Sequence, residues 1–83
     1  MRPIDVIATH KTSGEITPLR FRINEGDESI VVPIKSAILY EKQHLSRDND
    51  VLKFRCKVIV NETIKNCDIQ FHMQQMRWIL VKI

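Results

Sequence analysis

Apolar and polar residues alternate along most of this chain, and this period of two is the feature that most constrains its fold. Successive side chains of a β-strand point to opposite faces of a sheet, so a strand with one buried face alternates in this way. Runs with this alternation cover residues 4–9, 19–24, 30–34, 52–60 and 67–73, and the chain closes with a further apolar run at 77–83. The pattern therefore predicts an all-β chain.

Short polar segments between the runs predict turns. Ser13-Gly14, Gly26-Asp27 and Asn61-Glu62 lie between consecutive runs, and Gln74–Met76 must turn as well, although it carries no favoured turn residue. A glycine at the first central position, as in Gly26-Asp27, is typical of a type II′ hairpin. Neighbouring runs are therefore expected to pair as antiparallel hairpins.

Treating the first three turns as two-residue loops predicts which residues lie opposite each other. The expected pairs are Ala8–Leu19, Val6–Phe21, Ile4–Ile23 and Asp5–Arg22 around the first turn; Ile23–Ile30, Phe21–Val32 and Leu19–Ile34 around the second; and Cys56–Cys67, Phe54–Ile69, Leu52–Phe71 and Arg55–Asp68 around the third. A slip of one residue would place apolar side chains opposite charges. A slip of two would preserve the faces, so the loop lengths stay open.

The hairpins combine into two three-stranded meanders, residues 4–34 and 51–83. Each has one apolar face, so the two are expected to pack as a small six-stranded barrel or sandwich in a single domain. Residues 35–45 continue the third strand after a kink at Pro33 or form one short helix. The segment has no capping box and no glycine stop, which favours the bent strand. Pro18 and Pro33 require an edge, a strand start or a bulge, because proline cannot donate to the ladder.

The composition limits where in the cell this protein is expected and what it is expected to bind. The 83 residues include 13 Lys and Arg against 10 Asp and Glu, a net charge of +3 that permits an anionic partner without requiring one. No apolar run is long enough to span a bilayer, and the start lacks a signal core. Two cysteines are too few for a secreted disulfide scaffold. We expect a cytoplasmic protein with no membrane partner and no cofactor.

Four segments, Asp5–His10, Pro18–Arg22, Phe54–Cys56 and Arg77–Ile83, resemble a group of small, uncharacterised proteins of Gram-positive bacteria. The resemblance covers nearly the whole chain and implies a bacterial protein. It rests on strand sequences rather than on chemical motifs. The group has no assigned activity, so the resemblance implies no catalytic or binding residue.

The two cysteines are the first candidate for chemistry. Cys56 and Cys67 are expected to face each other on the inner side of a hairpin, close enough for a disulfide. They form a redox pair, half a metal site, or two buried thiols that act as small hydrophobic side chains. A zinc site needs about four ligands, and His72 has outward parity while His10 and His44 lie elsewhere. The buried-thiol reading is favoured, and we expect no metal.

Motifs of catalysis are absent from the sequence. It contains no nucleophile elbow, no phosphate-binding glycine loop and no metalloprotease signature. The acidic turns at 24–28 and 48–50 do not match a calcium-binding loop. The sequence therefore predicts a chain that is not an enzyme.

A basic sheet face is the second candidate site, formed by the outward residues Arg20, Arg22, Lys53, Arg55 and Lys57. Small β-barrels bind nucleic acid with such faces. Asp5 and Asp68 lie opposite two of the arginines, however, and the aromatic residues at 21, 54, 71 and 78 have inward parity. A solvated face is therefore favoured, and nucleic-acid binding is the alternative function.

The last strand is apolar on both faces. Trp78 and Leu80 are expected in the core, which leaves Ile79, Val81 and Ile83 on the other side. Such a strand is normally covered on both faces. The cover is either residues 35–45, with Ile38, Leu39 or Tyr40 as a lid, or another protein or second copy. The predicted function is a non-catalytic interaction or self-associating module, working by its last strand or by the bent segment near Tyr40.

Overall fold

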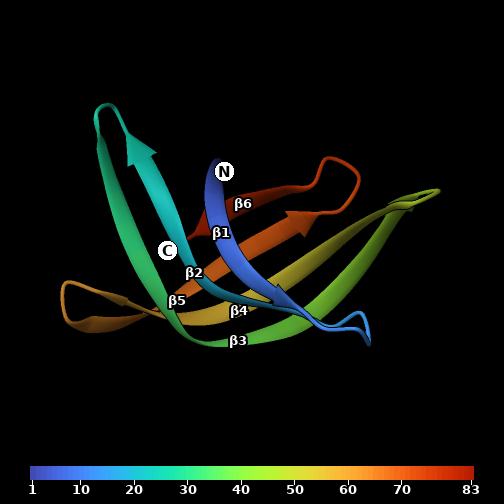
Figure 1. Cartoon of the computed structure of the whole chain (residues 1–83), viewed down its shortest axis with the longest axis horizontal. Helices are drawn as coiled ribbons and strands as arrows, with labels where there is room; N and C mark the ends of the chain where they lie inside the picture. Colours follow the sequence, from blue (N-terminus) through green and yellow to red (C-terminus); the bar gives the residue numbers. More distant parts are fainter.

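Six antiparallel strands form the secondary structure of the computed structural model, which describes all residues from 1 to 83 and contains no helix. They are β1 (Arg2–His10), β2 (Ile16–Glu25), β3 (Glu28–Ser46), β4 (Asn49–Val60), β5 (Thr63–His72) and β6 (Arg77–Lys82). Each strand pairs with the next, and β6 pairs with β1, so the sheet closes into a barrel (Figure 1). The predicted all-β, six-stranded fold is confirmed, as a barrel rather than a sandwich. No helix capable of crossing a membrane is present.

The predicted alternation builds the core. Along β4, the inward side chains Leu52, Phe54, Cys56 and Val58 are all buried, whereas Arg55 and Lys57 between them are exposed. Trp78 of β6 packs against two aromatic rings, with its centroid 4.7 Å from that of Phe71 and 5.6 Å from that of Phe54. Tilted ring pairs at such distances add to the burial energy. The barrel interior is therefore filled by side chains.

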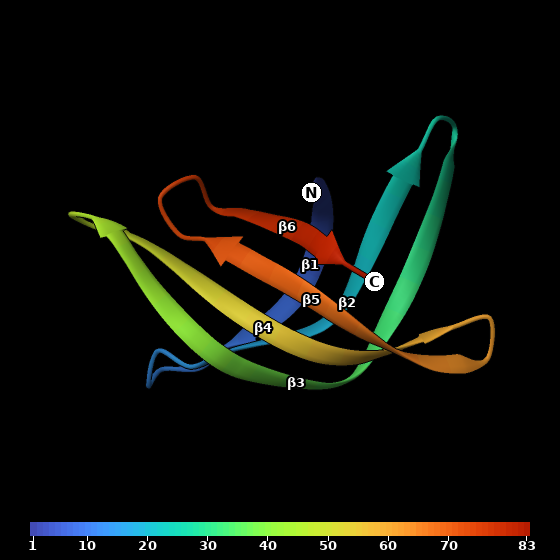
Figure 2. The same cartoon turned by 180° about the vertical axis from the view of Figure 1, so that it is seen from behind.

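β3 is a single strand of 19 residues that joins the two predicted meanders. It pairs with β2 as far as Pro33 and with β4 from Ile34 to Ser46. Register shifts at Ile34/Ser36, Leu39/Glu41 and His44/Ser46 bend it along the way. Residues 35–45 are thus a bent strand, as favoured over the short helix. β3 makes the corner of the barrel, where the sheet turns from β2 to β4 (Figure 2).

The third hairpin has the predicted register. Its four expected pairs, Cys56–Cys67, Phe54–Ile69, Leu52–Phe71 and Arg55–Asp68, are all Cα partners. Asn61 and Glu62 form the turn with φ angles of +50° and +63°, the backbone of a type I′ hairpin. At the second turn, Gly26 has φ of +57°, and the predicted pairs of Phe21 with Val32 and Ile23 with Ile30 are present.

The first hairpin differs from the prediction. A β-bulge between Ile7 and Ala8 places Ala8 opposite Pro18 instead of Leu19, which is 45% exposed. The loop is also longer than two residues, because the Lys11 amide donates to the Glu15 carbonyl across it. The predicted inward position of Leu19 is therefore wrong, since an extra residue in one strand shifts the pairing beyond it.

Two further predicted pairs are wrong because strands change partners at the barrel corners. Ile4 lies opposite Trp78 rather than Ile23. β1 pairs with β6 as far as Ile4, and its pairing with β2 begins only at Asp5. Leu19 does not pair with Ile34, since β3 has left β2 by that point. Because the barrel closes, these two hairpin pairs, expected from simple meanders, are absent.

The prolines lie where the ladder does not need their missing donor. Pro18 lies near the start of β2, next to Leu19, the extra residue of the β2 bulge, and Pro33 lies at the corner where β3 changes partners. Both positions agree with the prediction.

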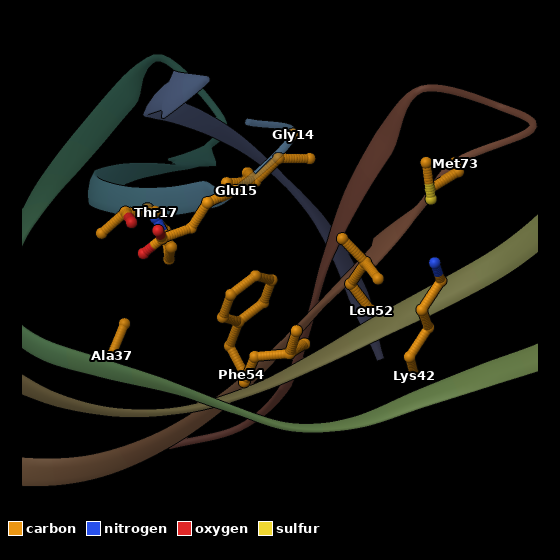
Figure 3. A pocket seen from close by; sticks show the side chains of 11 residues that line it. Gly14, Glu15, Thr17, Ala37, Lys42, Leu52, Phe54 and Met73 are labelled. Atoms are coloured by element: carbon orange, nitrogen blue, oxygen red, sulfur yellow. The ribbon is translucent and has the colours of Figure 1, made fainter. Parts of the chain in front are cut away.

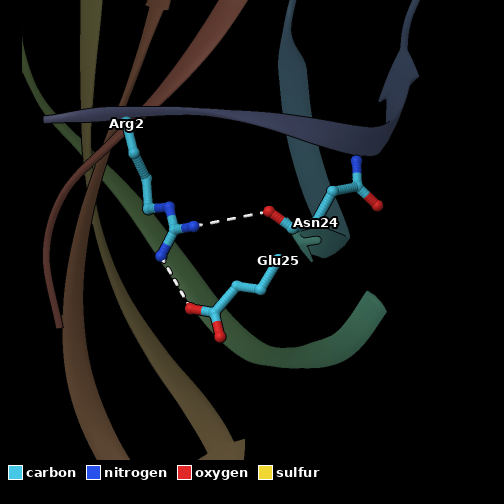
Figure 4. A network of polar contacts seen from close by, with 3 residues as sticks. All are labelled: Arg2, Asn24 and Glu25. Carbon is cyan, nitrogen blue, oxygen red and sulfur yellow. Dashed lines mark hydrogen bonds and ion pairs between the residues drawn. The ribbon is translucent and has the colours of Figure 1, made fainter. Parts of the chain in front are cut away.

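Two hairpins extend beyond the packed core. Residues 24–31, at the end of the β2–β3 hairpin, and residues 38–48, in the β3–β4 hairpin, are exposed throughout. We call these segments the β2–β3 arm and the β3–β4 arm (Figure 1). The β2–β3 arm is held beside its turn, where the guanidinium of Arg2 donates to the Glu25 carboxylate at 2.9 Å and to the Asn24 carbonyl at 3.4 Å (Figure 4). Both arms are antiparallel ladders, regular in the β2–β3 arm and interrupted by two register shifts in the β3–β4 arm.

Candidate interaction surface

The outward residues of β6 lie on a sheet face that is only partly covered. Ile79 and Val81 are half-buried, and Ile83 is exposed. Ile79 lies between Gln70 of β5 and Pro3 of β1, its Cα partners on either side. A register shift in β5 at Asp68/Ile69 leaves Val81 without a Cα partner. The neighbouring strands therefore give these residues the partial cover they have.

The predicted lid from residues 35–45 is wrong. β3 is in contact with β2 and β4 and makes no contact with β6. Tyr40, which we expected near the last strand, is separated from β6 by β4 and β5, a span of roughly 14 Å at the usual strand spacing. The candidate residues Ile79, Val81, Ile83 and Tyr40 thus lie in two separate places on the same sheet.

β3 carries the largest share of the exposed apolar side chains. Six of the thirteen large hydrophobic residues that are exposed lie on this one strand. They are Ile30 and Val31 on the β2–β3 arm, and Ile38, Leu39, Tyr40 and Leu45 on the β3–β4 arm. We call these six residues the β3 surface. Sequence alternation alone did not reveal it, because alternation shows which residues share a face and not where the strand leaves the core.

Tyr40 is the one aromatic side chain on the outside of the barrel. The guanidinium carbon of Arg55 lies 4.5 Å from the centroid of its ring, within the range of a cation–π interaction. Arg55 also lies 3.5 Å from the carboxylate of Asp68 on β5. The four aromatic residues predicted to point inward do so, but Tyr40 adds an exposed ring beside the basic residues that our sequence argument had not counted.

Three of the five residues of the predicted basic face are paired with carboxylates. Arg22 contacts Asp5 at 2.9 Å and Lys53 contacts Glu41 at 3.1 Å, in addition to the pair of Arg55 with Asp68. The hydrogen bonds from Arg22 and from Asn24 lower the pKa of Asp5 below its ordinary value. Arg20 and Lys57 have no carboxylate partner. These two therefore carry most of the free positive charge of that face.

A second polar cluster lies on the β3–β4 arm. Nδ1 of His44 is 2.7 Å from Oδ1 of Asp50, and Nζ of Lys42 is 3.6 Å from Oδ2 of the same carboxylate. The hydrogen bond with His44 lowers the pKa of Asp50. The Asp50 carbonyl also accepts a hydrogen bond from the Met73 amide. These contacts tie the two strands of the arm together and attach the arm to the β5–β6 turn.

Cys56 and Cys67 lie opposite each other in the core as free thiols. Burial raises the pKa of Cys56 to about 11 and that of Cys67 to about 12, so both stay protonated at neutral pH. The thiolate is the form that reacts and binds metal. No three His, Cys, Asp or Glu side chains converge at any point of the chain. The pair has the properties of small apolar core side chains.

A hollow of about 230 Å³ opens between the β1–β2 turn and the β3–β4 arm (Figure 3). Leu52 and Phe54 form its base, and Met73, Glu15 and Lys42 stand around them. Its volume is below the range of about 300–1,000 Å³ that is usual for small-molecule sites. The hollow fits the mouth of a small barrel better than a ligand cavity.

The chain thus belongs, by its fold, to the small, closed, up-and-down β-barrels, with two exposed arms. Comparison with models of protein families, with curated protein sequences and with solved structures found no match. The resemblance to a group of Gram-positive proteins stays a prediction.

Proposed function

We propose that this chain is a non-catalytic protein-interaction module that binds through the β3 surface. The observation that carries the proposal is the concentration of six exposed apolar side chains on this one strand. Three of them, Ile38, Leu39 and Tyr40, are consecutive on the β3–β4 arm. Exposed apolar side chains gathered in this way are typical of sites that another protein covers. This agrees with the part of our sequence prediction that named the bent segment near Tyr40.

The β3 surface contributes little to the barrel itself. Ile38 is 66% exposed and points outward beside Arg55 of β4. Burying an apolar side chain of this size contributes about 1.5–3 kcal/mol, and Ile38 obtains only a minor part of that in the free chain. The apolar surface of Ile38 therefore remains available to a partner.

Affinity capture from cells that make the protein tests the proposal with matched variants. Ile38→Lys should remove the captured partners, because a charge replaces an apolar contact at the centre of the β3 surface. Ile64→Lys is the control, since Ile64 is exposed to a comparable degree on the β4–β5 hairpin. Loss of the same partners with both variants, or with neither, would contradict the proposal.

Nucleic-acid binding is the second candidate, favoured by the exposed Tyr40 ring beside Arg55. An exposed aromatic ring among cations is the arrangement on which unpaired bases stack. Arg20, Arg22, Lys53, Arg55 and Lys57 are the residues that this function would use. Titration with single-stranded RNA at several salt concentrations tests it, because released counterions make such affinity fall steeply with salt. Weak or salt-insensitive binding would exclude it.

A further inference from the structure

One edge of the β2–β3 arm has no neighbouring strand. β3 pairs with β2 through residues 28–33, whereas its pairing with β4 begins only at Ile34. The β4–β5 hairpin leads away from the arm in both views (Figures 1 and 2). An open strand edge is a ready template for another strand.

The register determines which backbone groups face this open edge. Gly26 and Asp27 form a two-residue turn, so Glu25 and Glu28 are the first hydrogen-bonded pair of the hairpin. Hydrogen-bonded and non-bonded pairs alternate along an antiparallel ladder. The donors and acceptors of Ser29 and Val31 therefore point away from β2. Pro33 is the next residue of this set, and it has no N–H to donate.

We infer that a second copy of this chain pairs with the open edge of the β2–β3 arm, antiparallel and related by a two-fold axis that places Ile30 opposite its own counterpart. Ser29 of each copy then exchanges hydrogen bonds with Val31 of the other. A two-fold axis through Val31 would instead place Ser29 opposite Pro33, where a donor is missing. The Ile30-centred register thus uses all the outward donors and acceptors of Ser29 and Val31.

The same register extends the apolar face of the sheet. Ile30 is 47% exposed and lies opposite Ile23, which is buried in the core. Directly opposite residues of antiparallel strands have Cβ atoms about 4.5–5.5 Å apart. The two Ile30 side chains would therefore touch and form a row of four isoleucines with the Ile23 of each copy. This contact covers apolar surface that the free chain leaves in water.

Charges on the arm complement those at the corner of the second copy. Asp27 and Glu28 at the tip have no cationic partner, and Arg20 and Lys35 near the corner have no carboxylate partner. In the inferred register, Asp27 lies beside Pro33 of the other copy. Pro33 is the Cα partner of Arg20, and Lys35 follows two residues later. Each acidic tip would therefore lie against an unpaired basic corner, and such complementarity selects a partner.

The arm is already held in the shape that pairing needs. The bonds from Arg2 to Glu25 and Asn24 fix the β2 strand of the arm, beside its turn, to β1, so little ordering is required when a second strand adds. This inference rests on the proposed function, since it names a second copy as a partner of the Ile30 and Val31 end of the β3 surface.

Sedimentation equilibrium from about 1 µM to 1 mM tests the inference on wild-type protein and three variants. Ile30→Lys and Ile30→Glu should each weaken the dimer at least about tenfold, because like charges then lie directly opposite across the axis. Mixing the two variants should restore a heterodimer, since Lys then faces Glu. Ile64→Lys is the control and should dimerise like the wild type.

Val31→Pro gives a second measurement if either charged variant fails to fold, because it removes a donor from the open edge without removing one from the β2 ladder. It should weaken the dimer as well. A wild-type chain that is monomeric throughout, variants that dimerise normally, or a mixture that does not reform a dimer would each overturn the inference. None of these results would change the outcome of affinity capture with the Ile38→Lys variant. The proposed function is therefore tested independently of the dimer.

Discussion

β3 and β4 are neighbours in one sheet and alternate in the same way, yet they differ in what their side chains do. β4 buries its inward residues from Leu52 to Val58 almost completely. β3 is longer, buries only Val32 completely and exposes six large apolar residues. β4 has β3 and β5 beside it along most of its length, while β3 passes over a corner and continues into both arms.

The difference shows what a period of two does and does not establish. Alternation determines which residues share a face of the sheet. Burial also requires another layer opposite that face, and the arms have none. Apolar side chains on both faces of β3 are therefore available to a partner in the arms, whereas the inward side chains of β4 are committed to the core.

The largest expected effect is a direct test of this contrast between two leucines. Leu52→Ala should lower the free energy of unfolding by about 2–5 kcal/mol, the cost of a cavity in a packed core. Leu39→Ala should cost less than about 1 kcal/mol, because Leu39, on the neighbouring strand, is 49% exposed. Urea unfolding of the two variants measures both values. Equal losses would mean that β3 is as much a part of the core as β4.

The same contrast explains how much of the fold the sequence predicted. The β4–β5 register was predicted pair for pair, because Asn61 and Glu62 do form a two-residue turn and the continuous apolar face excludes a slip of one residue. The β1–β2 register was predicted only in part. Pro18 indicated an edge, a strand start or a bulge near this point, but it did not identify Leu19 as the extra residue that shifts the pairing at Ile7/Ala8.

The candidate site was less predictable than the fold. The sequence named Tyr40 and the last strand, but the place where β3 leaves the core depends on contacts between strands distant in sequence. The ion pair of Lys53 with Glu41 likewise depends on the register shift at Leu39/Glu41. Such shifts set which outward charges meet, and alternation does not contain them.

The stability of the well-packed β4–β5 hairpin is expected to depend on pH through its buried cysteine pair. The pKa values of Cys56 and Cys67 are raised from 9.0 to about 11 and about 12, so unfolded thiols lose their protons at lower pH than folded ones. Their contribution to stability is present below pH 9 and is lost as pH rises from 9 to 12. Unfolding curves across this range should show a steeper loss for wild type than for the Cys56→Ala, Cys67→Ala double variant. Parallel curves would mean that the thiols are accessible to solvent.

A smaller effect is expected where the outer faces of β3 and β4 meet. Arg55→Gln removes the contact with the Tyr40 ring and the pair with Asp68, both near the surface. It should cost about 1 kcal/mol at most. Lys57→Gln, at an unpaired position on the same strand, is the control and should be within about 0.5 kcal/mol of wild type. If the control cost as much as Arg55→Gln, the contacts of Arg55 would not stabilise the barrel.

The smallest effect is expected at Ile38, and it bears most directly on the β3 surface. Ile38→Lys should change the free energy of unfolding by no more than about 0.5 kcal/mol, because the side chain is already in water. A matched Val81→Lys variant should cost more, since Val81 is half-buried on β6. Thermal and urea unfolding measure both. A large loss at Ile38 would place it in the structural core, whereas a negligible loss together with lost partner capture would mean that the residue serves binding and not folding.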